Sequence, residues 1–524
     1  MNHSEAGRHR FDLAAAAVSA IVFGLFPLTS FDLWWHLASG REIWARHGIP
    51  RTDPFSFASD RGPWLDHGWL FQTLLYPLHA AGGSLLLQLV QVLIVFAIAW
   101  LGFRELGRSG VSRPVALLTM AIALAVVKPR LALRPELLTL LFLAILLTWL
   151  RKERWPVVGV MLMSLIWANV HPGVILGGLV LLVWCVAGWI GRRAILMLVT
   201  FSLPLIATPY GIESVLFPFR LRELVMRGGY VNPEWQPATF LNHPLLYLAI
   251  ATAALLFVTS KSEGRLQRAV VALLLAVFAV QYQRNVGAFG VALPFLVAPE
   301  LAREWSLNVR RLAAAAAALI AGYSLFTFTR PGLGIDRREI AVDATAFVKQ
   351  AGVRGRVFNQ AKFGGYLIWA LYPGEKVLID GRNEVYTGLL PRLAEAVGDG
   401  RKWRRFLDEQ RIEWAMIGYN NPPQRVVAGG RAEWRPFGYL HFPPREWALV
   451  YWDDTAMVLV RRGRVNQHLE KNAPRYLWPE SLAFAESRIR SGEWPRGAVA
   501  AELMNAMRQR PDVERAAALA ELVR

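Results

Sequence analysis

Long apolar runs recur through the first 330 residues of this chain, and they constrain its fold more than any other feature. The runs at 11–29, 85–103 and 312–328 are clear examples. Most are about 15–20 residues long, which is close to the length that an α-helix needs to cross the hydrocarbon core of a bilayer. The chain is 54% hydrophobic overall. These features predict an α-helical, polytopic membrane protein with about eleven transmembrane helices.

Basic linkers separate these runs and predict an orientation. From a cytoplasmic N-terminus, alternation along the chain places every basic linker on the cytoplasmic side, as the positive-inside rule requires. We therefore expect a multi-pass protein of the bacterial inner (cytoplasmic) membrane. The linkers and lipid contacts account for the net charge of +19, so membrane lipids are expected partners and nucleic acid is not. The linkers lie at 104–113, 151–154, 192–193, 261–268 and 303–311.

The chain changes character near residue 330. Short helical and strand-like segments alternate from there, which is typical of a soluble α/β domain. We expect a transmembrane domain over 1–330 with an outer loop at 31–70, an extracytoplasmic α/β domain over 331–470, and a C-terminal helical segment over 471–524. In the α/β domain, helices are predicted at 341–351 and 363–371, and strands at 356–359, 376–380, 414–418, 447–452 and 456–460.

The loop at 31–70 concentrates polar and aromatic residues beside lipid and is the predicted active site. Asp32 stands where the first apolar run meets the outer solution, and an acid there is costly unless it is paired or functional. We predict that Asp32 is a general base for an acceptor hydroxyl. Asp53 is the second catalytic candidate, although an aspartate before proline also fits a turn.

Further residues of the loop are predicted to bind substrate. Trp34 and Trp35, beside Asp32, are equally compatible with interfacial anchoring. The histidines and acids of the loop show no recognisable metal spacing such as HExxH, so no metal ligands are assigned, and a divalent cation held by oxygen atoms stays an open alternative. The predicted substrate-binding residues of the loop are Trp34, Trp35, His36, Asp66 and His67.

The outer turns supply candidate ligands for an anion. Arg130 and Arg134 occupy a turn between two apolar runs, and guanidinium groups bind phosphate through two parallel hydrogen bonds. The alternative is that both arginines snorkel to lipid headgroups. The remaining predicted substrate-binding residues, which the same alternation assigns to the outer side, are His171, Glu234, Trp235 and Arg284.

The order of these features resembles the integral-membrane GT-C glycosyltransferases, such as the protein mannosyltransferases and the aminoarabinose transferases of lipid A. It is most similar to bacterial GT-C-like proteins with a D-x-W-W-H-L loop, here residues 32–37. Two departures are Asp32-Leu33 in place of an acid pair and Gly68 in place of an acid before Trp69. The matching motifs are Asp32, Gly48-Ile49-Pro50, Gly62-Pro63-Trp64, Trp69-Leu70, Arg134-Pro135, Asn169 with His171, Pro209-Tyr210-Gly211, Glu234-Trp235 and Phe363-Gly364-Gly365-Tyr366.

The resemblance implies an inverting GT-C glycosyltransferase that moves a sugar from a polyprenyl-phosphate donor to an extracytoplasmic acceptor, which is a lipid, a glycan or a protein. Asp32 matches the catalytic base of that family. No cofactor is required, because an arginine can hold the charged phosphate leaving group. Two alternatives stay open: a lipid or sugar transporter or flippase in which the loop is a gate, and a non-catalytic membrane protein of envelope assembly.

Overall fold

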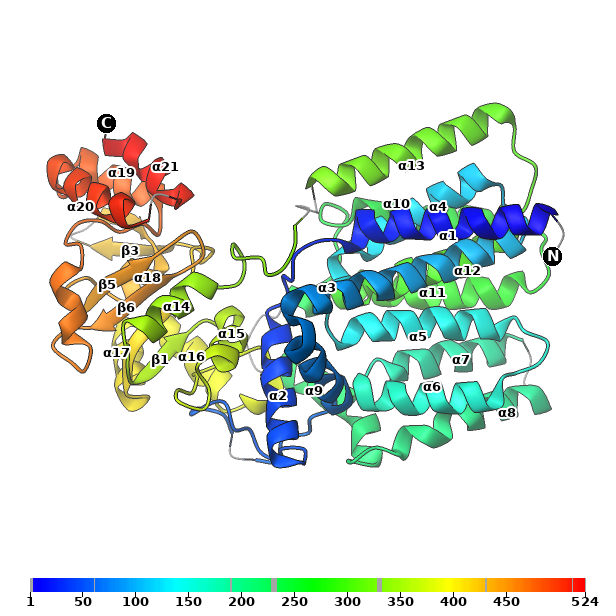
Figure 1. Ribbon diagram of the computed structural model, residues 1–524, viewed down its shortest axis with the longest axis horizontal. Helices are drawn as coiled ribbons and strands as arrows, with labels where there is room; N and C mark the ends of the chain where they lie inside the picture. The colour runs from blue at the N-terminus through cyan, green and yellow to red at the C-terminus, as the bar shows by residue number, and fades with distance from the viewer. Residues whose placement is uncertain are drawn as a thin grey trace.

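The computed structural model describes residues 3–60, 62–188, 191–227, 233–327, 332–428, 431–510 and 512–523. It has two parts: a large bundle of helices that holds the N-terminus and a smaller α/β part that holds the C-terminus (Figure 1). This agrees with the expected order of a helical region followed by an α/β region. The predicted boundary at 330–331 falls outside the described residues.

The helices of the bundle lie side by side along its long direction (Figure 1), α3 only in the part that follows its kink at Gly83. Several begin at the prolines that the sequence places at the start of apolar runs, as expected for a residue with a fixed φ and no N–H. The bundle helices are α1 (His3–Gly24), α3 (Trp69–Arg108), α4 (Arg113–Val127), α5 (Pro135–Leu150), α6 (Val157–Val170), α7 (Val174–Ala187), α8 (Arg192–Ser202), α10 (Pro244–Thr259), α11 (Arg265–Gln281), α12 (Val286–Leu301) and α13 (Leu307–Thr327).

Two described helices are long and apolar enough to cross a membrane by themselves, namely α3 and α13. Four others, α5, α6, α7 and α10, are apolar but shorter. Large apolar side chains lie exposed on the outside of the bundle, including Val258 at 79% and Leu319 at 74% exposure. The number of about eleven spans stays a prediction.

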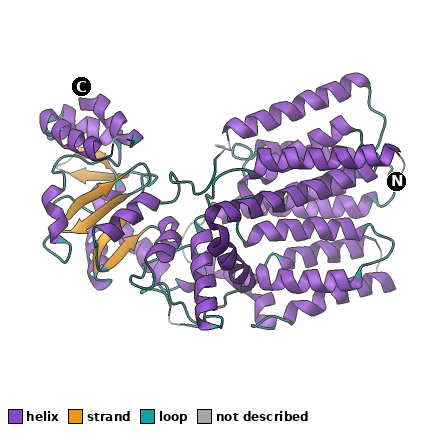
Figure 2. Ribbon diagram, in the orientation of Figure 1, coloured by secondary structure: helices purple, strands orange, loops and turns teal. Residues whose placement is uncertain are grey.

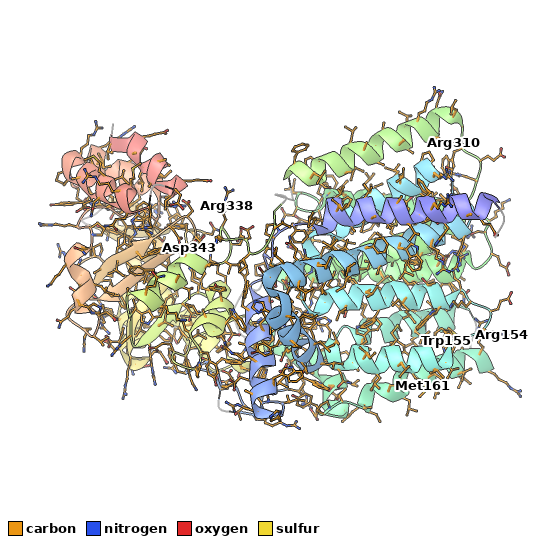
Figure 3. The ribbon with its side chains drawn as sticks, in the orientation of Figure 1. Arg154, Trp155, Met161, Arg310, Arg338 and Asp343 are labelled. Carbon is orange, nitrogen blue, oxygen red and sulfur yellow. The ribbon has the colours of Figure 1, made fainter. Side chains whose placement is uncertain are left out.

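The basic linkers gather at one end of the bundle. Arg113 donates a hydrogen bond to the carbonyl oxygen of Gly7 (3.3 Å), and Arg151 forms an ion pair with Glu105. Figure 3 shows Arg154 and Arg310 at this same end, away from the α/β part. The N-terminus and the basic linkers therefore share one end, and the α/β part lies at the other.

The first part of the predicted outer loop 31–70 is helix α2 (Asp32–Arg46). Helix α2 lies across the end of the bundle, between it and the α/β part (Figure 1). Leu33, Leu37 and Gly40 share one helical face and are buried. A methyl group at Gly40 would overlap with the backbone of Gln72, so α2 and α3 are in backbone contact. A further helix of this region is α9 (Ile212–Arg227).

The α/β part is built on a four-stranded sheet in the order β1-β2-β6-β5, in which β1 and β2 are parallel and the other pairs antiparallel. Figure 2 shows this sheet covered by helices. Its strands match four of the predicted ones. The elements are α14 (Val342–Gln350), β1 (Arg356–Asn359), α15 (Ala361–Leu371), α16 (Leu389–Val397), α17 (Gly400–Glu409), β2 (Ile412–Ile417), the β3 (Gln424–Ala428) and β4 (Arg431–Arg435) hairpin, α18 (Phe437–His441), β5 (Trp447–Trp452), β6 (Met457–Arg461), α19 (Leu482–Arg490), α20 (Arg496–Gln509) and α21 (Glu514–Val523).

The predicted strand at 376–380 is wrong. Its only strand-like pairing is an isolated bridge between Val377 and Ser56 of the outer loop. The side chain of Asn359 takes the place of a neighbouring strand, accepting from Leu378 N–H (3.0 Å) and donating to the carbonyl oxygen of Ile379 (2.7 Å). A side-chain amide can satisfy this backbone, so no ladder forms.

The outer loop is part of the α/β core. The N–H of Phe57 donates to Val377 O (3.2 Å), and Val377 N–H donates to Phe55 O (3.1 Å). Trp35, Phe55 and Trp64 are buried in the same hydrophobic cluster as the sheet. Segments far apart in the sequence thus form one folded unit at the end of the bundle.

Candidate active site

Asp32 begins helix α2 and faces the junction of the two parts. Its Oδ1 accepts a hydrogen bond from Trp35 Nε1 (3.1 Å). Burial raises the pKa of Asp32; the charge of Arg134 lowers it in part, and Glu234 raises it. Asp32 therefore lies close enough to Arg134 and Glu234 for their charges to act on it, and its carboxylate is a stronger base than an exposed aspartate.

The three aromatic residues after Asp32 are buried rather than presented to solvent. Trp34 packs edge-to-face on Tyr366 of α15, with 4.9 Å between ring centroids. Trp35 lies 3.6 Å from the ring of His36. Burial holds the pKa of His36 well below its usual value, so this imidazole is neutral. Trp35 holds Asp32 directly through its Nε1 hydrogen bond.

Asp53, the second catalytic candidate, is held by a dense set of donors. Its Oδ1 accepts from Phe55 N–H (3.0 Å) and from Arg382 Nη1 (2.8 Å), and its Oδ2 accepts from Ser56 N–H (3.1 Å). Burial alone would raise the pKa of Asp53, but Arg382 and these donors outweigh it and lower the pKa. The geometry is that of a turn that is fastened to the α/β part.

Arg382 joins the loop to the α/β part, and the sequence patterns did not indicate this role. It donates from Nε and Nη2 to the two oxygens of Asp380 (2.8 and 2.6 Å). Its third donor reaches Asp53, and both side chains of that ion pair are essentially fully buried. Its guanidinium also lies over the ring of Trp64, 4.8 Å from the centroid. The turn-like IDGRNE cluster at 379–384 was the available signal, but its partner lies far along the chain.

Asp66 and His67 lie just before the start of α3. Asp66 Oδ1 accepts from Gln72 Nε2 (2.6 Å) and from Gly68 N–H (3.3 Å), while its Oδ2 has no hydrogen-bond partner among the described residues. Burial raises the pKa of Asp66 to about 7. His67 packs on Phe217 of α9, with 4.6 Å between centroids, and burial, with a smaller contribution from Arg284, lowers its pKa to about 4.

Arg130 and Arg134 are brought together by a shared carboxylate, that of Glu234. Arg130 donates to Glu136 Oε1 (2.9 Å) and to Glu234 Oε1 (2.7 Å), and Arg134 donates to the same Glu234 oxygen (2.9 Å). Burial opposes the charge of Arg130, but Glu136 and Glu234 outweigh it and raise its pKa. Glu136 was not among the predicted residues; its signal in the sequence is an acid in the first turn of α5.

Arg284 is the arginine of this group that is not committed to a carboxylate. It lies over the ring of Trp235, 4.6 Å from the centroid, and Trp235 packs edge-to-face on Tyr282 at 5.8 Å. Among the described residues Arg284 has no hydrogen bond or ion pair. Burial lowers its pKa, Glu136 and Glu234 raise it, and Arg130 and Arg134 lower it. Arg130, Arg134 and Arg284 carry one positive charge more than Glu136 and Glu234 when Asp32 is not counted, and a guanidinium without an ion pair suits an anion.

His171 follows α6 and faces the same group. Its Nδ1 accepts from Gly173 N–H (3.0 Å) and lies 2.9 Å from Thr139 Oγ1. Burial lowers the pKa of His171 well below its usual value, and the charge of Arg284 lowers it further. Across the parts of the chain that the structure describes, no three His, Cys, Asp or Glu side chains gather as a metal site. A divalent cation therefore stays an untested alternative without a ligand set.

Comparison with known proteins places this geometry in a fold. No protein-family model matches the chain, and no curated protein matches it. Among solved structures, the oligosaccharyltransferase of Archaeoglobus fulgidus in its apo form matches with a TM-score of 0.56 at 11% identity, over 96% of this chain and 86% of that chain. This chain has a GT-C fold. The same archaeal enzyme, tethered by a disulfide bond to an acceptor peptide containing the NVT sequon, matches with a TM-score of 0.47 at 11% identity over 82% and 74% of the two chains; the fold assignment rests on the first.

The expected GT-C resemblance is thus confirmed at the level of the fold. Within this GT-C fold, Asp32 and the arginines of the outer turns lie at the same end of the bundle, next to the α/β part. The structure brings together Asp32, Arg130, Arg134, Glu234, Trp235, Arg284, His67 and His171, whereas the side chains of Trp34, Trp35, His36, Asp53 and Asp66 are buried. Their roles in binding and catalysis stay predictions.

Proposed function

We propose that this protein is a membrane glycosyltransferase that transfers a sugar from a polyprenyl-phosphate donor to a hydroxyl group of an extracytoplasmic acceptor. The observation that carries the proposal is the placement of Asp32 beside the arginine group. Asp32 is a half-buried carboxylate with a raised pKa, and the charges of Arg134 and Glu234 reach it. A transferase that uses a phosphate leaving group needs this combination.

The chemistry is a single displacement. Asp32 takes the proton of the acceptor hydroxyl, whose oxygen forms a new bond to the anomeric carbon. The bond between that carbon and the phosphate oxygen breaks, and the lipid phosphate leaves with the electron pair. Attack from the face opposite the leaving group inverts the anomeric centre. Arg284, which lacks a carboxylate partner among the described residues, holds the departing phosphate, and Arg130 and Arg134 add to the positive potential.

Asp32 is preferred over Asp53 as the base. The carboxylate of Asp53 is occupied by Arg382 and two backbone N–H groups, and its lowered pKa makes it a weak base. Asp32 accepts one side-chain hydrogen bond and has a raised pKa. A base works best when its pKa approaches the working pH.

The membrane setting follows from the same end-to-end arrangement. The bundle exposes large apolar side chains over its sides, and the basic linkers share the N-terminal end (Figure 3). By the positive-inside rule this end is cytoplasmic, so Asp32 and the α/β part face the outside of a bacterial inner membrane. A lipid-linked donor reaches the site from the outer leaflet.

The test is release of lipid phosphate. Purified protein in lipid nanodiscs is incubated with a panel of polyprenyl-phosphate sugars and an envelope extract as the source of acceptor, and free polyprenyl phosphate is measured. We expect release by wild type that requires the extract, and no release by Asp32→Asn. Movement of intact donor across the bilayer without release would instead indicate a flippase. If neither release nor movement is observed, a non-catalytic role is favoured.

A further inference from the structure

Thr139 and Trp167 form a buried hydrogen-bonded relay that ends at His171. Trp167 Nε1 donates to Thr139 Oγ1 (2.8 Å), and Thr139 Oγ1 lies 2.9 Å from His171 Nδ1. Trp167 is fully buried and Thr139 is 4% exposed. Because the indole N–H can only donate, it occupies a lone pair of the threonine oxygen and leaves the threonine proton free to point at the imidazole.

The backbone reaches the same nitrogen. Gly173 N–H donates to His171 Nδ1 (3.0 Å). A backbone N–H cannot accept, so Nδ1 carries a lone pair and no proton. A methyl group at Gly173 would crowd both Nδ1 of His171 and the side chain of Thr139, so the turn after α6 closes on this contact. Glycine allows that approach.

The two donors to Nδ1 determine the state of the ring. A neutral imidazole has one proton, and with Nδ1 occupied by acceptor contacts the proton is on Nε2. Burial favours the neutral form of His171 most, and the charges of Arg284, Arg134 and Arg130 also oppose its protonation. A metal ligand needs a nitrogen lone pair, and in this tautomer neither nitrogen offers one.

We propose that Thr139 and Trp167 are positioning residues that hold His171 as a neutral Nε2–H donor to the departing phosphate, and not as a metal ligand. This inference rests on the proposed function for the identity of the ligand. In this arrangement the Nε2–H of His171 is a neutral hydrogen-bond donor that acts beside the guanidinium of Arg284. Both would stabilise the negative charge that develops on the phosphate as the glycosidic bond breaks. The tautomer of His171 is set by Thr139 and Gly173 and does not depend on which reaction the protein catalyses.

Two substitutions at His171 distinguish a hydrogen-bond donor from a metal ligand. Gln places an N–H near the position of Nε2, whereas Glu offers oxygen ligands to a metal and repels a phosphate. We expect His171→Gln to keep kcat within about threefold of wild type and His171→Glu to lose about a hundredfold, the scale of one lost transition-state donor. Greater activity in His171→Glu than in His171→Gln, or equal loss in both folded variants, would overturn the proposal.

The role of Thr139 is tested by substitution, with a control residue on the same helix, α5. Thr139→Val removes the hydroxyl at nearly constant shape, and we expect kcat to fall about three- to tenfold with little change in the KM for donor. Thr139→Ser restores the hydroxyl and should recover most of the activity. Thr148→Val is the matched control, because Thr148 is buried on the same helix and bonds only its own backbone at Ala144 (3.0 Å). Equal effects of Thr139→Val and Thr148→Val would contradict a relay.

The tautomer of His171 can also be measured directly, without an activity assay. Nitrogen-15 spectra of histidine-labelled wild-type protein, with the His171 signals assigned by their loss in His171→Gln, should show a protonated Nε2 and an unprotonated Nδ1 from pH 5.5 to 8. A protonated Nδ1, or titration in this range, overturns the inference. If the spectrum is as expected but wild type releases no lipid phosphate, the proposed function and the ligand assigned to His171 are rejected. The hydrogen-bonded relay from Trp167 through Thr139 to His171 would still stand.

Discussion

The α-carbon of Gly381 lies against the carboxylate of Asp32. A methyl group at Gly381 would overlap with Asp32 Oδ1, and one at Gly365 would overlap with the carbonyl oxygen of Phe31, the residue before it. Two glycines of the α/β part therefore allow backbone contact with the start of α2. The position of the proposed base is set by a part of the chain that is distant in sequence.

Gly381→Ala is expected to displace the Asp32 carboxylate and lower kcat by about 10²-fold, the effect of a misplacement of roughly 1 Å. The measurement is phosphate release at saturating donor, with thermal unfolding to show that the protein folds. Gly497→Ala is the control, since a methyl group there meets open space. Matching kcat values for the two variants would mean that Asp32 does not depend on this contact.

Asp32→Asn keeps the shape of the side chain and removes the base, so turnover should fall by about 10²–10⁴-fold. Because burial raises the pKa of Asp32, the folded state holds its proton more tightly than the unfolded state. Ionised Asp32 therefore costs stability above that pKa, and the variant should unfold at a higher temperature than wild type at neutral pH. A stable Asp32→Asn protein with wild-type turnover would transfer the role of base elsewhere.

Arg284→Ala is expected to raise the KM for donor about tenfold or more, because the free guanidinium is the proposed phosphate ligand. Arg284→Lys should recover only part of the loss, since an ammonium lacks the planar pair of donors. The matched control is Arg303→Ala, because Arg303 also lies over an indole, that of Trp305 at 4.0 Å, but on a basic linker. A donor KM unchanged in Arg284→Ala would place the phosphate elsewhere.

Asp53→Asn tests whether this residue is catalytic or structural. It leaves the buried Arg382 guanidinium without one of its carboxylates, and loss of one partner from a buried ion pair costs about 3–5 kcal/mol. We expect a clear drop in unfolding temperature, with residual activity in proportion to the folded fraction. Asp343→Asn, which breaks a largely exposed pair with Arg337, should change stability by less than about 1 kcal/mol. A stable but inactive Asp53→Asn protein would restore its catalytic role.

Asp66 should make folding stability depend on pH. Burial raises its pKa from 3.8 to about 7, so the folded state binds more protons than the unfolded state between those values. Stability therefore falls as pH rises from about 4 to 7, by up to about 1.4 kcal/mol per pH unit from this group. Asp66→Asn removes the contribution. Thermal unfolding of both proteins should diverge as the pH rises from about 4 to 7 and show a constant difference above that. Curves that run parallel from about pH 4 to 7 would contradict the raised pKa.

Local patterns were enough for the helices and for most of the sheet. Apolar runs of near-bilayer length formed the bundle because a helix satisfies its own backbone within a short stretch of chain. The strands β1, β2, β5 and β6 were recognisable for a similar reason, as short apolar segments between turns. The segment 376–380 has the same composition, but Asn359 and the outer loop took up its backbone groups.

Residue patterns alone predicted the bundle, the α/β part that follows it, and an acid at the end of the first apolar run. Which polar groups meet depends on the packing of distant segments: Arg382 with Asp53, Arg130 with Glu136 and Glu234, and Thr139 with His171. The reason is physical. Helix and strand formation depend on neighbours in sequence, whereas a buried charge or hydroxyl must find whichever partner packing brings to it, because leaving it unpaired away from water is costly.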